Sequence, residues 1–125
     1  MRRAIYDTLV DTGEFKAIYQ PYTAPEGCET PYAVIKMYGD DGVPDNFKGQ
    51  KEGFSVFIYT DPDSYVLIDS LVMAVRETLD KVLLVYDSPV RYFRPEYIKT
   101  TEDAFDDRKN LFVKRVDFNI PGIRV

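Results

Sequence analysis

The residues of this sequence with the most obvious chemistry are carboxylates, whose oxygens could coordinate hard cations such as Ca²⁺ or Mg²⁺. They gather in three groups, at Asp40, Asp41 and Asp45, at Asp61 and Asp63, and at Glu102, Asp103, Asp106 and Asp107. No group has the Asp-x-Asp-x-Asp-Gly spacing of a calcium-binding loop. Asp61 and Asp63 stand where a helix start would use them. We therefore expect solvated surface at all three groups and no bound metal.

Catalysis by a nucleophile and a base has no support in the residues. The sequence contains no histidine, so neither a Ser/His/Asp nor a Cys/His arrangement can be built within it. The single cysteine, Cys28, is followed by Glu29, and a neighbouring carboxylate disfavours the reactive thiolate. The glycines match no phosphate-binding motif. We expect no enzymatic activity and no cofactor.

Ten tyrosines and no tryptophan are the most unusual feature of the composition. Tyrosine could stack on nucleic-acid bases, but proteins that do so add a positive groove. The only locally basic stretch here contains Arg91, Arg94 and Lys99, and Glu96 partly offsets it. Tyrosine also suits protein interfaces, because it combines apolar area with a polar tip. The tyrosines therefore indicate either the core and rim of a sheet or a protein–protein contact.

Length and charge narrow the class of protein. A chain of 125 residues predicts one domain over residues 1–125. Its net charge of -5 argues against a grip on phosphate backbones, and one cysteine cannot form an internal disulfide. The longest apolar runs have five residues, against the ~18 that a membrane span needs. We expect a protein made in the cytoplasm, with no membrane partner.

Two amphipathic helices are predicted to position these residues. Residues 2–12 carry apolar side chains four apart, and Gly13 follows where a helix end favours positive φ. Residues 62–80 repeat apolar side chains at helical spacing, with Asp61 as the expected N-cap and Pro62 at the first helical position.

Strands are predicted from runs of aromatic and β-branched residues. They cover residues 17–20, 32–38, 54–59, 83–86 and 112–120, whereas 87–110 is polar and predicted to be loop. Between two strands, residues 39–53 form a charged arm rich in glycine, too long for a tight turn and expected to be mobile or ordered by a partner. This order predicts an α+β fold, a mostly antiparallel sheet with two amphipathic helices packed on one face.

Several local features follow one another along nearly the whole chain. They are the first helix (Arg2–Thr12), Tyr19, the loop Ala24-Pro25-Glu26-Gly27, the strand entry Thr30-Pro31-Tyr32-Ala33-Val34-Ile35, the strand Phe54–Tyr59, the helix at 62–80, the acidic loop Glu102–Asp107, and Lys114-Arg115-Val116-Asp117-Phe118-Asn119-Ile120. In this order they resemble the tail terminator, or tail-to-head joining, proteins of long-tailed bacteriophages. The resemblance implies an α+β fold and a homohexameric ring that binds the tail-tube protein on one face and the head connector on the other. It also implies a structural virion protein at the head–tail junction, without catalysis or specific nucleic-acid binding.

Two interface predictions depend on the resemblance to ring-forming tail terminator proteins. A ring through which DNA passes should repel phosphate, so acidic residues of the arm are predicted to face the lumen or a partner ring. The charged residues of the arm are Asp40, Asp41, Asp45, Lys48, Lys51 and Glu52. Cyclic assembly also needs two different complementary patches on each subunit. The predicted halves are the basic residues Arg91, Arg94 and Lys99 and the acidic residues Glu102, Asp103, Asp106 and Asp107, because opposite charges steer docking.

Three alternative functions fit the same residues. The chain could be another ring or adaptor subunit of the same particle, such as a head-closure or tube-forming protein. A small cytoplasmic enzyme or ligand-binding domain would need a concave pocket with convergent polar groups. An inhibitor that mimics nucleic-acid charge would use the net charge of -5, although such mimics usually carry denser runs of acid.

Overall fold

The computed structural model describes residues 2–21, 23–25, 27–38, 53–63, 65–86 and 91–120. Within these ranges the chain forms two helices and eight strands. Their order and bounds are α1 (Arg2–Val10), β1 (Ala17–Tyr19), β2 (Tyr32–Tyr38), β3 (Gly53–Thr60), α2 (Tyr65–Leu79), β4 (Leu84–Tyr86), β5 (Arg91–Phe93), β6 (Glu96–Thr100), β7 (Ala104–Asp106) and β8 (Leu111–Asn119).

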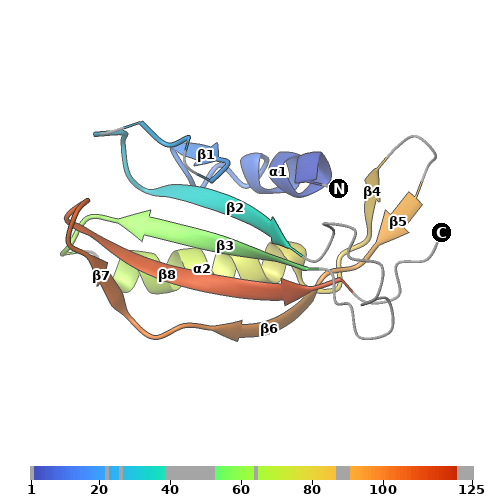
Figure 1. Cartoon of the computed structure of the whole chain (residues 1–125). Helices are drawn as coiled ribbons and strands as arrows, with labels where there is room; N and C mark the ends of the chain where they lie inside the picture. Colours follow the sequence, from blue (N-terminus) through green and yellow to red (C-terminus); the bar gives the residue numbers. More distant parts are fainter. Residues whose placement is uncertain are drawn as a thin grey trace, which may run out of the picture.

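The main sheet has the strand order β1-β2-β3-β8-β6, and β7 pairs with β8 beside β6. Only the β1–β2 pair is parallel, and the other pairs are antiparallel. The strands β4 and β5 form a separate two-stranded sheet that extends from one end of the molecule (Figure 1). The fold is therefore α+β with a mostly antiparallel sheet, which confirms the predicted fold class.

The hydrophobic core lies between the two helices and one face of the sheet. In Figure 1, α2 runs behind β3 and β8, and α1 lies beside β1 and β2. Phe54 and Phe118 are directly opposite in register and stack with ring centroids 5.0 Å apart. Ile5 and Leu9 of α1 join the same buried cluster. Side chains alternate between the two faces of a strand, and none of the described residues forms a helix on the opposite face of the sheet.

The first helix ends two residues earlier than predicted, and Gly13 takes the expected positive φ after it. The N–H groups of Thr12 and Gly13 reach back three residues, to the carbonyl oxygens of Leu9 and Val10 at 3.2 and 3.1 Å. Gly13 then takes φ of +70°, a conformation that costs a residue with Cβ. Asp11 and Thr12, which were predicted to be helical, form this closing turn.

The predicted start of the second helix was wrong. α2 begins at Tyr65, and Asp61, Pro62 and Asp63 precede it in a turn. Asp61 lies too far before Tyr65 to act as the N-cap, and its Oδ1 instead accepts a hydrogen bond from the Thr30 hydroxyl at 2.8 Å. The sequence pattern of an N-cap is the same whether the aspartate binds the helix backbone or a distant hydroxyl, so the pattern alone could not reveal this contact.

The segment 87–110 was predicted to be loop, but it contains β5, β6 and β7. The strands β6 and β7 are short and mostly exposed, with Ile98 53% and Phe105 44% accessible. The pairing of β6 with β8 is also interrupted by a shift between Tyr97 and Lys99. Exposure and the shift remove the regular alternation by which a strand is predicted.

Candidate interaction surfaces

Part of the predicted interface falls outside the described residues. This applies to Asp40, Asp41, Asp45, Lys48, Lys51 and Glu52, and to the side chain of Arg91. The structure places the remaining predicted interface residues.

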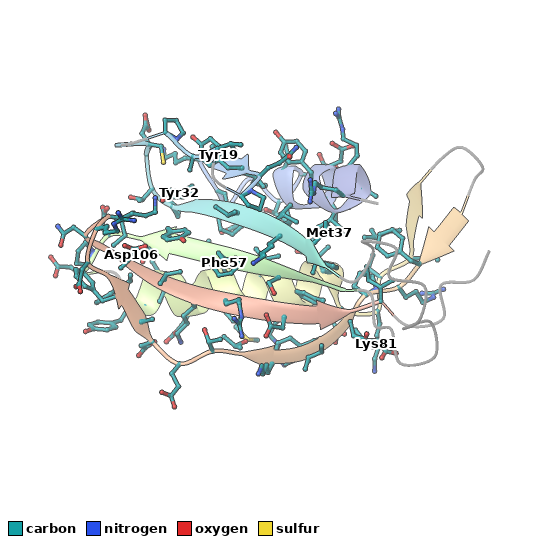
Figure 2. The ribbon with its side chains drawn as sticks, viewed as in Figure 1. Tyr19, Tyr32, Met37, Phe57, Lys81 and Asp106 are labelled. Carbon is teal, nitrogen blue, oxygen red and sulfur yellow. The ribbon has the colours of Figure 1, made fainter. Side chains whose placement is uncertain are left out.

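The remaining basic and acidic residues are spread along the sheet. Arg94 is exposed, and its Nη1 donates to the carbonyl oxygen of Lys81 at 3.2 Å, just beyond the end of α2. Asp106 pairs with Leu111 at the start of β8, so Lys81 and Asp106 mark opposite ends of the molecule (Figure 2). A nine-residue strand spans about 26 Å between its end residues. Arg94 and the turn at Asp106 therefore lie far apart within one subunit, whereas Lys99 lies between them, opposite Asp117.

The acidic loop is partly engaged within the subunit. Oδ1 of Asp106 accepts hydrogen bonds from the backbone N–H groups of Arg108 and Lys109, both at 3.1 Å, and so shapes the turn before β8. Asp103 forms an ion pair with Lys114 at 3.0 Å. Glu102 and Asp107 are exposed.

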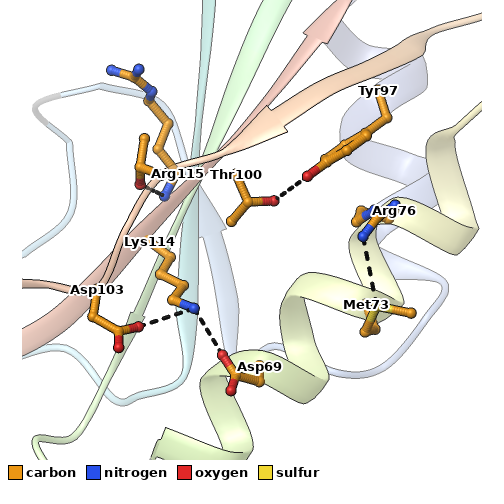
Figure 3. A network of polar contacts seen from close by, with 9 residues as sticks. Asp69, Met73, Arg76, Tyr97, Thr100, Asp103, Lys114 and Arg115 are labelled. Atoms are coloured by element: carbon orange, nitrogen blue, oxygen red, sulfur yellow. Dashed lines mark hydrogen bonds and ion pairs between the residues drawn. The ribbon is translucent and has the colours of Figure 1, made fainter.

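Lys114 connects the sheet to α2. Its Nζ lies 2.8 Å from Oδ1 of Asp69 on the helix and 3.0 Å from Oδ1 of Asp103 (Figure 3). The hydrogen bond to Asp69, reinforced by Asp103, raises the pKa of Lys114 despite the opposing effect of burial. Arg76 of the same helix stacks over the Tyr97 ring at 4.0 Å, and the Tyr97 hydroxyl is 2.7 Å from that of Thr100.

The face of the sheet opposite α2 carries cross-strand rows of alternating chemistry. We call it the open face, and define it by Val34, Lys36, Ser55, Phe57, Tyr59, Lys99, Val113, Arg115 and Asp117. One row runs from Lys36 through Ser55 and Asp117 to Lys99, and the next contains Val34, Phe57 and Arg115. Figure 2 looks onto this face, with Phe57 near its middle. Val34, Phe57 and Arg115 remain partly accessible, whereas Ser55 and Asp117 are buried.

A buried carboxylate stabilises the polar row of the open face. Asp117 and Ser55 are each only 6% exposed, and the Ser55 hydroxyl donates to Oδ1 of Asp117 at 2.7 Å. Nε of Arg115 lies 2.9 Å from the same oxygen, an ion pair in which the N–H is not aligned for a hydrogen bond. Since a buried charge needs compensation, we assign these contacts a structural role.

An aromatic cluster lies at the other end of the open face. Tyr32 stacks on Tyr59 with centroids 4.8 Å apart and meets Tyr19 edge-on at 5.6 Å. Burial, assisted by the neighbouring Cys28, raises the pKa of Tyr32. A hollow of about 470 Å³ lies beside this cluster. Its lining includes the apolar or aromatic residues Val34, Phe57 and Tyr59 and two lysines, Lys36 and Lys109. This lining suits a partner surface that has an apolar centre surrounded by acidic groups.

The outer side of α2 is unusually apolar for a solvent-facing helix. Val66 is 85% exposed, Tyr65 57% and Met73 47%. Tyr65 also packs on Phe112 at 4.6 Å, and Phe112 meets the exposed Phe105 at 6.0 Å. Exposed apolar groups that gather in this way mark interaction sites.

Metal binding and a membrane-spanning helix find no support in the described residues. In the part of the chain that the structure describes, no group of three or more metal-ligating side chains is placed to hold an ion. Neither helix of that part is long and apolar enough to cross a membrane.

Sequence reasoning missed both the open face and the outer side of α2 as interaction surfaces. Lys36, Lys99 and Arg115 come from three strands, and only the pairing register brings them to one face. The signal in the sequence was the alternation of charged and apolar residues in the predicted strands at 32–38 and 112–120. For the helix, Val66 and Met73 stand off the predicted apolar stripe and could have been noticed.

The sequence matches no protein-family profile and no curated protein. The fold is similar to that of a chain in a solved structure described as the virion of a native gene transfer agent particle. The two agree with a TM-score of 0.63, covering 96% of this chain and 92% of that chain at 15% sequence identity. A likeness at this identity shows a shared fold.

Proposed function

We propose that this chain is a structural, non-catalytic protein of a phage-like virion. In this proposal a homohexameric ring of the chain caps the tail tube, ends its polymerisation and joins the tail to the head. Its partners are other copies of itself, the tail-tube protein and the head connector, and it is located at the head–tail junction.

The observation that carries the proposal is the fold shared with a chain of the gene transfer agent virion. The similarity extends over nearly the full length of both chains, so it concerns the whole arrangement rather than one common motif. The features that resemble tail terminator proteins in the sequence agree with it. Two exposed surfaces that suit protein contacts, the open face and the outer side of α2, add independent support for a role in assembly.

Deletion of the gene from a particle-producing strain tests this function, with a plasmid copy of the wild-type gene as the control. Negative-stain electron microscopy of the deletion strain should show tails of uncontrolled length that are separate from the filled heads. The plasmid copy should restore joined particles. Tails of normal length joined to heads in the deletion strain would overturn the proposal.

The same images distinguish the main alternative. If the chain forms the tube itself, the deletion strain should contain heads and no tails at all. This alternative shares the virion location and the likeness of fold, and differs from the proposed function only in the position of the chain in the particle.

A further inference from the structure

Two broad surfaces on opposite sides of the main sheet are left uncovered by the described residues. One is the open face. The other, which we call the helix side, consists of exposed side chains of α2 and of the adjoining loop, namely Tyr65, Val66, Asp69, Met73, Glu77 and Asp103.

The open face is basic, although the chain is acidic. Its cations Lys36, Lys99 and Arg115 stand against one carboxylate, Asp117, which is buried and in contact with Arg115. Glu96 and Asp106 pair with Asn119 and Leu111 at the two ends of β8 and so lie on the same face. The excess of cations is therefore confined to the middle of the open face, at Lys36 and Lys99.

The helix side has the opposite character. Asp69 and Asp103 keep side-chain exposures of 66% and 64% while they share Lys114, and Glu77 is also exposed. The cations nearby are already engaged, because Lys114 is only 16% exposed between its two partners and Arg76 stacks over an aromatic ring. Val66 and Met73 supply an apolar centre to this acidic surface.

We propose that the open face of one copy docks on the helix side of a second copy, and that this contact is the seam of the ring. Basic and apolar residues then meet acidic and apolar residues, which favours association in one orientation. Because the two surfaces lie on opposite sides of the subunit, the contact is head-to-tail and closes into a ring when its rotation permits. The inference rests on the proposed function, and it identifies the self-contact that this function requires.

The chemistry favours a protein occupant over a nucleic acid. Val34 and Phe57 occupy the middle of the open face, and Val113 lies beside Tyr59 toward its aromatic end. A phosphate backbone on this face would leave these apolar side chains uncovered. A second copy covers them and at the same time covers Val66, which is 85% exposed. Of the residues predicted for the seam, Lys99 lies on the open face and Asp103 on the helix side.

Cross-linking in assembled particles tests this contact. The variant Cys28→Ser, Lys36→Cys, Met73→Cys places one thiol on each surface of the full chain and removes the native one. After treatment with a flexible bismaleimide, denaturing gels should show a ladder of covalent oligomers longer than dimers. The matched control Cys28→Ser, Lys36→Cys, Lys99→Cys places both thiols on the open face and should give no such ladder.

A charge reversal provides a second readout. Lys36→Glu with Lys99→Glu should lower incorporation of the chain into particles by about tenfold, because two attractive contacts become repulsive. Adding Glu77→Lys should recover part of this loss. If the cross-linking variant is present in particles and gives no ladder, the seam is overturned and the proposed function is left intact. If the wild-type chain is itself absent from particles, both are refuted. Normal incorporation of the charge-reversed chain together with defective DNA delivery would also overturn the seam and assign the open face to nucleic acid.

Discussion

Two phenylalanines of β3 should respond very differently to truncation, because they point to opposite faces of the sheet. Phe54 is fully buried and stacks on Phe118 in the core, whereas Phe57 stands on the open face between Val34 and Arg115 and is partly accessible. Phe54→Ala is expected to cost about 3–5 kcal/mol of unfolding free energy through lost burial and a cavity. Phe57→Ala should cost about 1 kcal/mol, since only part of its surface is buried in the subunit.

Urea unfolding followed by circular dichroism measures both changes. With a urea dependence of about 2 kcal/mol per M, the midpoint should fall by about 2 M for Phe54→Ala and by about 0.5 M for Phe57→Ala. A domain of this size has a total stability of about 6–19 kcal/mol, so both variants should still fold. In particles, Phe57→Ala should reduce incorporation more than its small loss of stability explains. Equal losses of stability for the two variants would show that the open face is already buried in the single subunit, and would refute the reasoning.

Three further perturbations test individual contacts. Ser55→Ala should lower the unfolding free energy by about 1.5–3 kcal/mol, because the buried Asp117 loses its hydroxyl donor. Ser70 is exposed, so the control Ser70→Ala should stay within about 0.5 kcal/mol of wild type. Lys114→Met should cost about 1 kcal/mol at neutral pH, a modest value because both aspartate partners are largely solvent-exposed. The pKa of Lys114 is raised above its ordinary value of 10.5 in the folded state, so its contribution to stability is complete below that value and is lost as the pH rises through the folded pKa. Chemical denaturation at about pH 8 and about pH 11.5 should therefore show the stability difference between wild type and Lys114→Met shrinking at the higher pH. A constant difference would contradict this assignment. Gly13→Ala should lower the unfolding free energy by about 1–2 kcal/mol through the positive φ alone, since no atom lies within 4 Å of a Cβ built there. Gly13→Asn should lower it less, and urea unfolding of both variants measures the difference.

Much of the fold could be predicted from the sequence where burial imposes a period on the residues. β2 and β3 place apolar side chains on the core face at alternate positions, β8 does so except at Lys114, and Gly13 marks the end of α1. The strands β5, β6 and β7 could not be predicted, because short exposed strands carry no such period. The start of α2 was misplaced because Asp61 and Pro62 fit a cap by residue type alone, whereas α2 begins at Tyr65 and the Asp61 carboxylate binds the Thr30 hydroxyl.

The candidate surfaces could be predicted only in part. Lys99 and the acidic loop were recognised from charge alone, but charge does not show that Asp103 is held by Lys114 or that Asp106 shapes a turn. The open face required the pairing register, which brings Lys36 beside Ser55, and Asp117 beside Lys99. Interaction surfaces built from several strands are long-range properties of the fold, so they become visible only once the strands are paired.

The central claim, a ring of this chain at the junction of tail and head, is tested most directly by electron cryomicroscopy of that junction in intact particles. We expect density for a single ring at the head-proximal end of the tail tube, with subunits that fit a sheet backed by α2 and with each open face against the helix side of its neighbour. Density for this fold in every repeat of the tube, or nowhere at the junction, would contradict the account.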